Sequence, residues 1–352
     1  MNLLGRLAHL AVAMAVMLPF ASALTYHGAD YSSLINLENS GKTFKDNGTT
    51  AKFDAILAKR GVNLARIRIW TSTSDSNYSL NYGLQLAKRA KALGMKLLID
   101  LHYSDTWADP GHQSIPSSWP KDLAGLNTQI YTYTKDLVST FSSQGVPIDF
   151  LQIGNEINDG FLWPVGRISV NGYSPLSQLL HSARNGAKDA NSNVKIMVHL
   201  ADGWKGSAVA SFYQQVFIPG QFAATELDVM GFSMYPFYNT GATYSALKSS
   251  LNTLVSQYNK DIMIVETDWA VSCPGVTMSE RSIPISAAGQ TQWVAGIRDV
   301  VASLPNGRGI GLVYWEPSWI GNANLGSSCA DALLVDGSGN SRESMNMFSS
   351  AM

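Results

Sequence analysis

The sequence predicts a single (β/α)8 barrel, because short apolar segments alternate with amphipathic helical segments along nearly all of its 352 residues. Strands that alternate with helices form parallel βαβ units, and eight such strands in about 300 residues favour a closed barrel over an open doubly wound sheet. No Gly-x-Gly-x-x-Gly turn follows the first strand, which argues against a dinucleotide-binding fold. The expected strands are Thr25–Tyr31, Asn63–Trp70, Lys96–Tyr103, Ile148–Ile157, Lys195–Ala201, Leu227–Tyr235, Asp261–Trp269 and Gly309–Glu316. The expected helices include Thr50–Arg60, Tyr82–Leu93, Thr128–Ser142, Pro175–Ala190, Tyr244–Tyr258 and Ala288–Leu304.

Residues 1–23 precede the first strand and have the pattern of a secretory signal peptide. Arg6 and His9 stand before an apolar run from Leu10 to Leu18, and small residues follow. The run is shorter than the about 20 apolar residues that span a bilayer. We therefore expect a cleaved leader, a barrel domain over residues 24–352 and an extracellular location; the alternative is a buried N-terminal helix.

The segments that leave the expected strands are long and aromatic, whereas those that enter them are short. Gly61, Gly94 and Gly145 stand where a helix would end and the next strand begin. Active sites of barrels lie at the end where the strands leave, and aromatic rings there would suit the apolar face of a sugar. An alternative is that several of these rings only stiffen the loops. Tryptophans at or just beyond strand ends are Trp70, Trp107, Trp119, Trp163, Trp204, Trp269, Trp315 and Trp319.

The charge balance favours a neutral partner. Charged residues make up 14% of the chain and the net charge is −1, without a basic run, so neither nucleic acid nor an anionic membrane has an electrostatic binding surface here. No His/Cys cluster has zinc spacing and no dense acidic calcium loop is present. The expectation is therefore no metal and no cofactor.

Two further features fit an oxidising compartment. Cys273 and Cys329 are the two cysteines of the chain, and an even pair outside the cell is a disulfide candidate. They would tie together the loops after the seventh and eighth strands. Asn47-Gly-Thr and Asn77-Tyr-Ser are glycosylation sequons, usable if the chain is secreted.

Two expected strands end in a carboxylate, at Glu156 and Glu266. In the strand expected over Ile148–Ile157, alternation places Gln152, Gly154 and Glu156 on one face, so Glu156 is expected to point to the barrel axis. One glutamate at a strand end is more often structural, but two at equivalent ends indicate a site. Two carboxylates that flank one bond are typical of glycoside hydrolysis, retaining at about 5 Å separation and inverting at about 6.5–9.5 Å; the sequence does not give this distance.

Longer motifs resemble those of a known family. Gly154-Asn155-Glu156 and the glutamate that closes the seventh strand resemble clan A glycoside hydrolases, which are retaining barrels. Further matches resemble glycoside hydrolase family 53, whose fungal members are arabinogalactan endo-β-1,4-galactanases that cleave side chains of pectin. These motifs are Arg66–Trp70 (RIRIW), His102–Gly111 (HYSDTWADPG) and Tyr314–Ala323 (YWEPSWIGNA).

The resemblance implies roles for the residues that carry the chemistry. Glu156 would be the general acid/base and Glu266 the nucleophile. Arg68, which shares the inward face of its strand with Arg66, would keep the nucleophile ionised; either arginine could instead only pair with a buried acid. Tyr235 would orient Glu266.

The same resemblance implies the groups that bind the sugar. Asn155 would bond the sugar 2-hydroxyl. His102 and His199, which alone would be taken for core histidines, become hydrogen-bond partners of sugar or carboxylate. Substrate contacts are expected from Trp107, Asp109, Trp204, Trp269, Trp315 and Trp319, with Trp315 under the −1 subsite.

Three positions depart from the fungal pattern. Asp268 stands where we expect Asn, two residues after Glu266 and so on the same strand face, where it would shift the pKa of the nucleophile or compete with it. Ala270 replaces a usual Pro, and Ala201–Trp204 differs slightly after His199.

The resulting expectation is a monomeric, retaining endo-β-1,4-galactanase that acts on neutral (arabino)galactan. Another clan A glycanase, acting on mannan, xylan or glucan, would use the same carboxylates. A sugar-binding barrel without catalysis is the alternative of a different class, and it would be expected to lack one of them.

Overall fold

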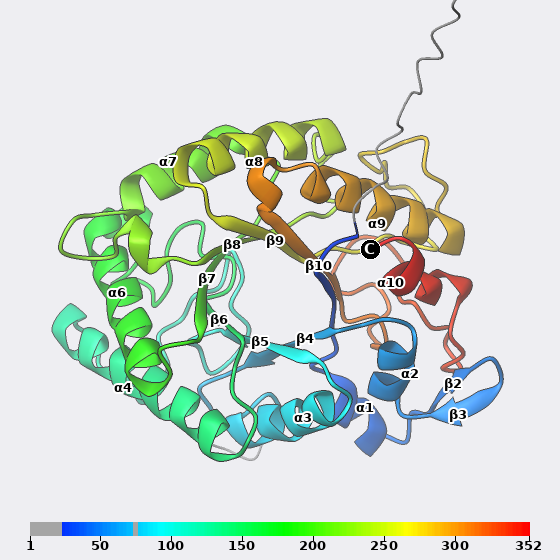
Figure 1. Ribbon diagram of the computed structural model, residues 1–352, viewed down its shortest axis with the longest axis horizontal. Coiled ribbons are helices and arrows are strands. Elements are labelled where there is room, and N and C mark those ends of the chain that lie inside the picture. The colour runs from blue at the N-terminus through cyan, green and yellow to red at the C-terminus, as the bar shows by residue number, and fades with distance from the viewer. Residues whose placement is uncertain (1–22, 73–76) are drawn as a thin grey trace, which may run out of the picture.

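The computed structural model describes residues 23–72 and 77–352, and eight parallel strands in it close into a barrel (Figure 1). The strand order around the barrel is β1-β10-β9-β8-β7-β6-β5-β4, which follows the chain and closes between β1 and β4. This confirms the predicted fold, and all eight expected strands are present. They are β1 (Tyr26–Asp30), β4 (Leu64–Ile69), β5 (Lys96–Leu101), β6 (Phe150–Ile153), β7 (Lys195–Leu200), β8 (Val229–Ser233), β9 (Asp261–Glu266) and β10 (Gly309–Trp315).

Helices surround the barrel and cover the outer face of its strands (Figure 1). Side-chain caps fix the start of several of them: Ser79, Asp122, Thr243 and Ser286 each accept a backbone N–H from the first turn of the helix that follows. The helices are α1 (Leu34–Asn39), α2 (Phe53–Lys59), α3 (Leu80–Ala92), α4 (Leu123–Ser143), α5 (Ile168–Asn171), α6 (Tyr173–Ala190), α7 (Gly206–Val216), α8 (Tyr244–Tyr258), α9 (Ala287–Ala302) and α10 (Met347–Ser350), with 3-10 turns η1 (Ala224–Glu226), η2 (Pro305–Gly307) and η3 (Glu343–Asn346). In the described residues, no helix combines the length and the hydropathy needed to cross a membrane.

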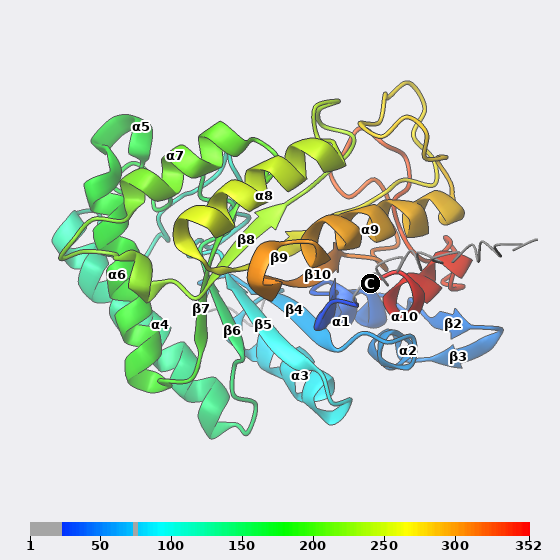
Figure 2. The same ribbon diagram turned by 45° about the horizontal axis from the view of Figure 1, so that its top comes forward.

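A small antiparallel hairpin stands outside the ring of helices, beside α2 (Figure 2). It pairs β2 (Phe44–Asp46) with β3 (Thr49–Ala51). The helix expected from Thr50 is therefore wrong at its start, because α2 begins only at Phe53. Asn47 and Gly48 both have positive φ, which suits the tight turn of a hairpin, and Asn-Gly is the strongest short hairpin signal.

The barrel interior is built in layers that lead up to the site. Apolar side chains fill the lower layer, and they include Leu64, Leu98 and Phe150. Because strand side chains alternate, the next inward positions on the same strands are Arg66, Asp100 and Gln152. Asp100 and Gln152 lie in register across β5 and β6, and the Arg66 guanidinium contacts both. A polar layer therefore lies directly on an apolar one, and the lower layer closes the barrel beneath it. The lower layer consists of Leu64, Leu98, Phe150, Met197, Val229, Met263, Val265 and Val313.

The strands are shorter at their carboxyl ends than their apolar sequence pattern predicts. Tyr103, Glu156, Asp202 and Glu316 follow four of these ends with φ between 45° and 57°. Non-glycine residues occupy this left-handed region at a cost of roughly 1–3 kcal/mol each, and such positions cluster at functional sites. The alternation argument for Glu156 is therefore wrong, because β6 ends at Ile153 and the carboxylate reaches the barrel axis through an irregular turn.

Candidate active site

A cavity of about 400 Å³ opens at the carboxyl ends of the strands, where most of the expected site residues meet. Glu156 and Glu266 both line it, although they come from opposite parts of the barrel, after β6 and at the end of β9. A shift in register between β8 and β9 places Glu266 opposite Ser233. The expected residues that line this cavity are Glu156, Glu266, Arg68, Asn155, Tyr235, His102, Trp107, Asp109 and Trp315.

Arg66, at the base of the cavity, forms the ion pair with Glu266. Its Nη1 lies 2.9 Å from Glu266 Oε1, and the same guanidinium contacts Asp30 at 2.8 Å and Asp100 at 3.0 Å. Tyr235 donates its hydroxyl to Glu266 Oε2 at 2.9 Å, which is the contact expected from the sequence. Burial raises the pKa of Glu266, and the charge of Arg66 opposes this rise. The direct ion pair and the tyrosine favour an ionised carboxylate.

The expected pairing of Arg68 with Glu266 is wrong. Arg68 Nη1 instead lies 2.5 Å from Glu316 Oε1, and its guanidinium carbon lies 4.1 Å from the ring centre of Tyr78 and 4.5 Å from that of Trp107. Ser33 donates both its backbone N–H and its hydroxyl to the same glutamate. The two arginines share the inward face of β4, but Arg66 lies one layer deeper, at the height of Glu266. The alternation of side chains along a strand predicts which face a residue occupies, but it does not predict which residue it contacts across the barrel.

Among the residues that the structure describes, no basic side chain contacts Glu156 directly. Its Oε1 lies 2.6 Å from the Ser233 hydroxyl. Burial of the carboxyl group, followed by the negative charge of Glu266, raises the pKa of Glu156 to about 8. The two carboxylates of the cavity therefore have unlike surroundings, one held by an arginine and a tyrosine and one by a serine hydroxyl.

A buried amide and imidazole network lies beneath Glu156. Asn155 Oδ1 accepts from Arg66 Nη2 at 2.9 Å, and its Nδ2 donates to the Ala108 carbonyl at 2.9 Å. Asn155 does line the cavity, as expected, but its amide already has protein partners in this structure. His199 is fully buried, does not line the cavity and contacts Asn155 and Ser233, so its expected direct contact with sugar or catalytic carboxylate is wrong.

His102 lies at the cavity wall. The backbone N–H of Ala108 donates to its Nδ1 at 3.0 Å, and its Nε2 lies 3.1 Å from Asp100 Oδ2. Burial alone would raise the pKa of Asp100, but Arg66 and then His102 lower it to about 2. Asp100 therefore stays charged and orients His102 towards the cavity.

Of the tryptophans expected to contact substrate, two line the cavity and three do not. Trp107 and Trp315 line the cavity, with ring centres 6.2 Å apart. Trp319 stacks behind Trp107 at 6.0 Å, and Trp204 bonds to Asp202 at the rim; neither lines the cavity.

Trp269 as a substrate contact is wrong. It is fully buried, donates its indole N–H to the Pro284 carbonyl and packs on Trp293 of α9. The reason is that β9 already ends at Glu266, so Trp269 belongs to a turn that packs back against the helix layer.

Comparison with known proteins agrees with this geometry. A model described as glycosyl hydrolase family 53 matches residues 26–348. The chain belongs to this family. An arabinogalactan endo-β-1,4-galactanase of Humicola insolens is 45% identical over 333 residues, which cover 93% of this chain and 99% of that one. A probable arabinogalactan endo-β-1,4-galactanase A of Neosartorya fischeri is 47% identical over 325 residues, 90% of each chain.

Solved structures give the same family. A fungal β-1,4-galactanase, 45% identical, superposes with a TM-score of 0.90 and covers 93% of this chain and 99% of that one. The family 53 catalytic domain of Ignisphaera aggregans, 29% identical, superposes with a TM-score of 0.81 and covers 93% and 95%. Xylanase 10B of Thermotoga maritima, 16% identical with a TM-score of 0.60, shares the fold alone.

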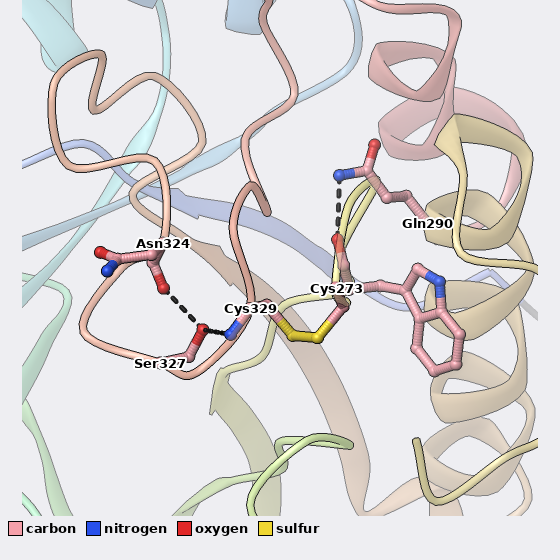
Figure 3. Close-up of a disulfide and its surroundings, with 6 residues drawn as sticks. Cys273, Gln290, Asn324, Ser327 and Cys329 are labelled. Atoms are coloured by element: carbon pink, nitrogen blue, oxygen red, sulfur yellow. Dashed lines mark hydrogen bonds between the residues drawn. A yellow bond between two sulfur atoms is a disulfide. The ribbon is translucent and has the colours of Figure 1, made fainter. Parts of the chain in front are cut away.

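The disulfide between Cys273 and Cys329 is present, as expected (Figure 3). It joins the loop after β9 to the loop after β10. Backbone hydrogen bonds between Ser272 and Asp331 lie beside it, and Ser327 accepts the backbone N–H of Cys329. The bond therefore holds together two loops that begin at the cavity.

Asp268 is buried outside the cavity, so its expected place beside Glu266 on one strand face is wrong. The strand ends at Glu266, and the chain turns before Asp268. Neither carboxylate oxygen has a hydrogen-bond partner of ordinary geometry in the described residues. Burial, and then the charge of Glu266, raise the pKa of Asp268 well above its usual value, and the nearby backbone N–H of Trp315 opposes this rise. The carboxyl group of Asp268 therefore favours its neutral form.

Sequence reasoning missed several buried polar residues that shape the family 53 site. Asp30 and Asp100 stand within or at the end of apolar strands, which was a usable signal, because such charges are rarely buried without a partner. Glu316 directly follows an apolar strand and could have been found by the same rule. Ser233 and Tyr238 carry no such signal, and only the fold brings them to the cavity.

Other expectations concern the surface and the N-terminus. Asn47 and Asn77 are both exposed, and their glycosylation stays a prediction. In the part of the chain that the structure describes, no group of three or more His, Cys, Asp or Glu side chains is arranged to hold a metal. Residues 1–22 of the expected signal peptide lie outside the described residues.

Proposed function

We propose that this chain is an endo-acting, retaining β-1,4-galactanase that cleaves the neutral galactan or arabinogalactan side chains of pectin. The observation that carries the proposal is that Glu156 and Glu266 line one cavity in a family 53 barrel, where the curated relatives are named arabinogalactan endo-β-1,4-galactanases. The tryptophan-lined wall supplies apolar faces for sugar rings.

In the first step Glu266 attacks the anomeric carbon and Glu156 gives its proton to the departing glycosidic oxygen. In the second step Glu156 takes a proton from water, and that water displaces Glu266 from the anomeric carbon with a second inversion. The net result is retention of configuration. The roles require one carboxyl group that is protonated and one that is ionised at working pH.

The surroundings of the two groups support this division. The Arg66 guanidinium and the Tyr235 hydroxyl both contact Glu266 and favour the charge that a nucleophile needs. Glu156 has a raised pKa of about 8, and no cation contacts it within residues 23–72 and 77–352, so it keeps its proton through neutral pH. When Glu266 becomes bonded to the sugar it loses its charge, and the pKa of Glu156 falls in time for base catalysis.

We also propose that the protein acts outside the cell as a monomer. The disulfide supports the location, because such bonds persist in oxidising compartments. The signal-peptide pattern and the two exposed sequons agree with it. Mass spectrometry of the secreted protein would give the leader cleavage site and the glycan occupancy, and light scattering the oligomeric state.

The direct test is release of reducing ends from linear β-1,4-galactan, β-1,4-mannan, xylan and carboxymethylcellulose. The proposal predicts galactan as the preferred substrate, and the kcat/KM profile should fall as pH rises through about 8 while Glu156 loses its proton. Glu156→Gln should remove this alkaline limb and lower kcat by about 10²–10⁴-fold. Preference for another glycan would reject the substrate, and an unchanged pH profile in the variant would reject the role of Glu156.

A further inference from the structure

A continuous line of hydrogen-bonding groups runs from the base of the cavity to Glu156. Arg66 donates to Asn155 Oδ1; from there His199 Nδ1 lies at 2.7 Å, and its other nitrogen, Nε2, lies 2.8 Å from Ser233 Oγ. Ser233 Oγ in turn lies 2.6 Å from Glu156 Oε1. His199 is fully buried and Ser233 nearly so. Because each group in the line can donate or accept only a fixed number of hydrogens, the position of every proton can be worked out from one end.

The arginine end fixes the first proton. Arg66 has only donors, so the atom of Asn155 that faces it is the amide oxygen; the amide nitrogen donates to the Ala108 carbonyl on the other side. An amide oxygen only accepts. His199 Nδ1, at 2.7 Å from that oxygen, must therefore carry a hydrogen.

Gln152 does not disturb this assignment, although its Nε2 lies 3.1 Å from His199 Nδ1. Arg66 donates to Gln152 Oε1, which fixes the orientation of this amide as well. The two hydrogens of Gln152 Nε2 have Asp100 Oδ1 and Asn155 Oδ1 as acceptors. Gln152 Nε2 therefore has no further hydrogen that must point at the imidazole of His199.

The remaining protons follow from the neutrality of His199. The ring is enclosed beside the permanent charge of Arg66, and burial together with that charge lowers the pKa of His199 well below its ordinary value. With a hydrogen on Nδ1, a neutral ring has a bare Nε2, which accepts the Ser233 hydroxyl hydrogen. A serine has one such hydrogen, so Ser233 Oγ can only accept from Glu156, and the hydrogen between them belongs to Glu156 Oε1.

We propose that His199 and Ser233 are positioning residues that hold the proton of the general acid on Glu156 Oε1 in the resting enzyme. This inference rests on the proposed acid role of Glu156. In the resting enzyme, Glu156 Oε1–H donates its hydrogen bond to Ser233 Oγ. When substrate binds, the glycosidic oxygen replaces Ser233 Oγ as the acceptor. Once the proton has passed to the leaving group, Ser233 turns to donate to the carboxylate, and it turns back when Glu156 takes a proton from water.

The tautomer of His199 is the most direct readout, because it is measured without substrate and does not depend on activity. Nitrogen-15 NMR of histidine-labelled enzyme, with His199 assigned by its loss in a variant, should show Nδ1 protonated, Nε2 bare and no titration between about pH 5 and 8. A hydrogen on Nε2, or a charged ring, would overturn the proposal. Galactan hydrolysis by the same sample reports the proposed function separately.

A pair of variants tests the consequence for the acid. His199→Asn keeps an amide donor for Asn155 but removes the acceptor for Ser233, so Ser233 becomes free to donate to ionised Glu156. The alkaline limb of kcat/KM should then move down by about one pH unit. The other groups that act on Glu156 are unchanged, namely Glu266, Arg66, Asp109, Tyr235 and Tyr238.

Two controls separate this effect from a structural one. In a Ser233→Ala background, His199→Asn should not move the alkaline limb, because the serine that transmits the effect is absent. His102→Asn changes a similarly buried histidine that contacts Asp100 and not Ser233, and it should leave the limb in place whatever it does to the rate. A shift that persists without Ser233, or no shift in His199→Asn, would contradict the proposal.

Discussion

Two walls of the cavity each contain an arginine–glutamate ion pair, but the two pairs differ in their exposure to the cavity. On one wall Arg66 of β4 pairs with Glu266 at the end of β9, and on the other Arg68 of β4 pairs with Glu316 after β10. Glu266 keeps 6% of its surface exposed and lines the cavity, whereas Glu316 has none exposed and does not. A buried arginine–glutamate pair at a strand end is therefore no mark of catalysis by itself. What distinguishes the first wall is that its carboxylate faces open space.

The second partner of each glutamate strengthens this contrast. Glu266 receives one hydroxyl, from Tyr235, which leaves lone pairs free for a substrate. Glu316 is enclosed by Ser33, whose hydroxyl and backbone N–H occupy its oxygens together with Arg68. We infer that the first wall is arranged for reaction and the second for holding β1, β4 and β10 together.

The largest expected effect is that of removing the proposed nucleophile. Glu266→Gln keeps the shape of the side chain but cannot bond to the anomeric carbon, so kcat on galactan should fall by more than about 10⁴-fold. Glu316→Gln is the matched control on the other wall, and its kcat should fall far less. Steady-state rates of both purified variants, with circular dichroism to verify folding, measure the two losses. Equal losses of kcat would contradict the distinction between the two walls.

Exchange of each arginine for lysine tests which one supports the nucleophile. Arg66→Lys retains one charge but cannot contact Asp30, Asp100, Glu266, Gln152 and Asn155 at once, and kcat should fall by about 10²–10³-fold, as for a lost electrostatic donor. Arg68→Lys should instead lower the free energy of unfolding by about 1–3 kcal/mol with a smaller loss of rate. Chemical denaturation and kinetics on the same samples give both numbers. A larger rate loss from Arg68→Lys would restore the pairing first expected from the sequence.

The disulfide joins the loops that follow the two walls, and its loss tests whether they depend on each other. Its cysteines are 56 positions apart, and opening a loop of that size should cost about 3–5 kcal/mol in the chain-entropy model. Cys273→Ser with Cys329→Ser should therefore unfold at lower denaturant concentration, while KM and kcat at 25 °C change little. An unchanged midpoint would show that the backbone pairing at Ser272 and Asp331 already fixes these loops.

The smallest expected effect is a gain in stability at Asp268, behind the first wall. The pKa of this carboxyl group is raised in the folded protein, so the unfolded chain releases its proton first and wild-type stability falls as pH rises above the unfolded value of about 3.9. Asp268→Asn has no proton to lose. Its advantage should be absent near pH 4, grow with pH and reach about 1–3 kcal/mol at neutral pH. Denaturation curves at pH 4, 6 and 8 would refute this if the difference stayed constant or shrank.

The sequence was sufficient for the barrel and for the two carboxylates, and insufficient for their partners. Strand and helix periodicities act over a few residues, so all eight strands could be located, and Asn47-Gly48 is a local signal of the same kind for the hairpin. The partner of each arginine depends on the register between strands on different sides of the barrel. That register is set when the sheet closes into a barrel, and no local sequence pattern predicts it.

Errors at the strand ends have a second cause. Glu156 and Glu316 adopt positive φ just where the alternation of a strand was assumed to continue. Trp269 was expected in the cavity for the same reason, and the chain in fact turns after Glu266 and buries its ring against α9. Irregular backbone of this kind concentrates at functional sites, so the rules that locate the strands fail at the residues of most interest.

Trapping of the covalent intermediate tests the central claim most directly. A galactobiosyl fluoride with fluorine in place of the reacting ring's 2-hydroxyl slows both steps, and its good leaving group lets the first step outpace the second. Mass spectrometry of proteolytic peptides should then find one disaccharide adduct, on Glu266. An adduct on Glu316 or Glu156, or galactan hydrolysis with no adduct and inverted product, would contradict the account.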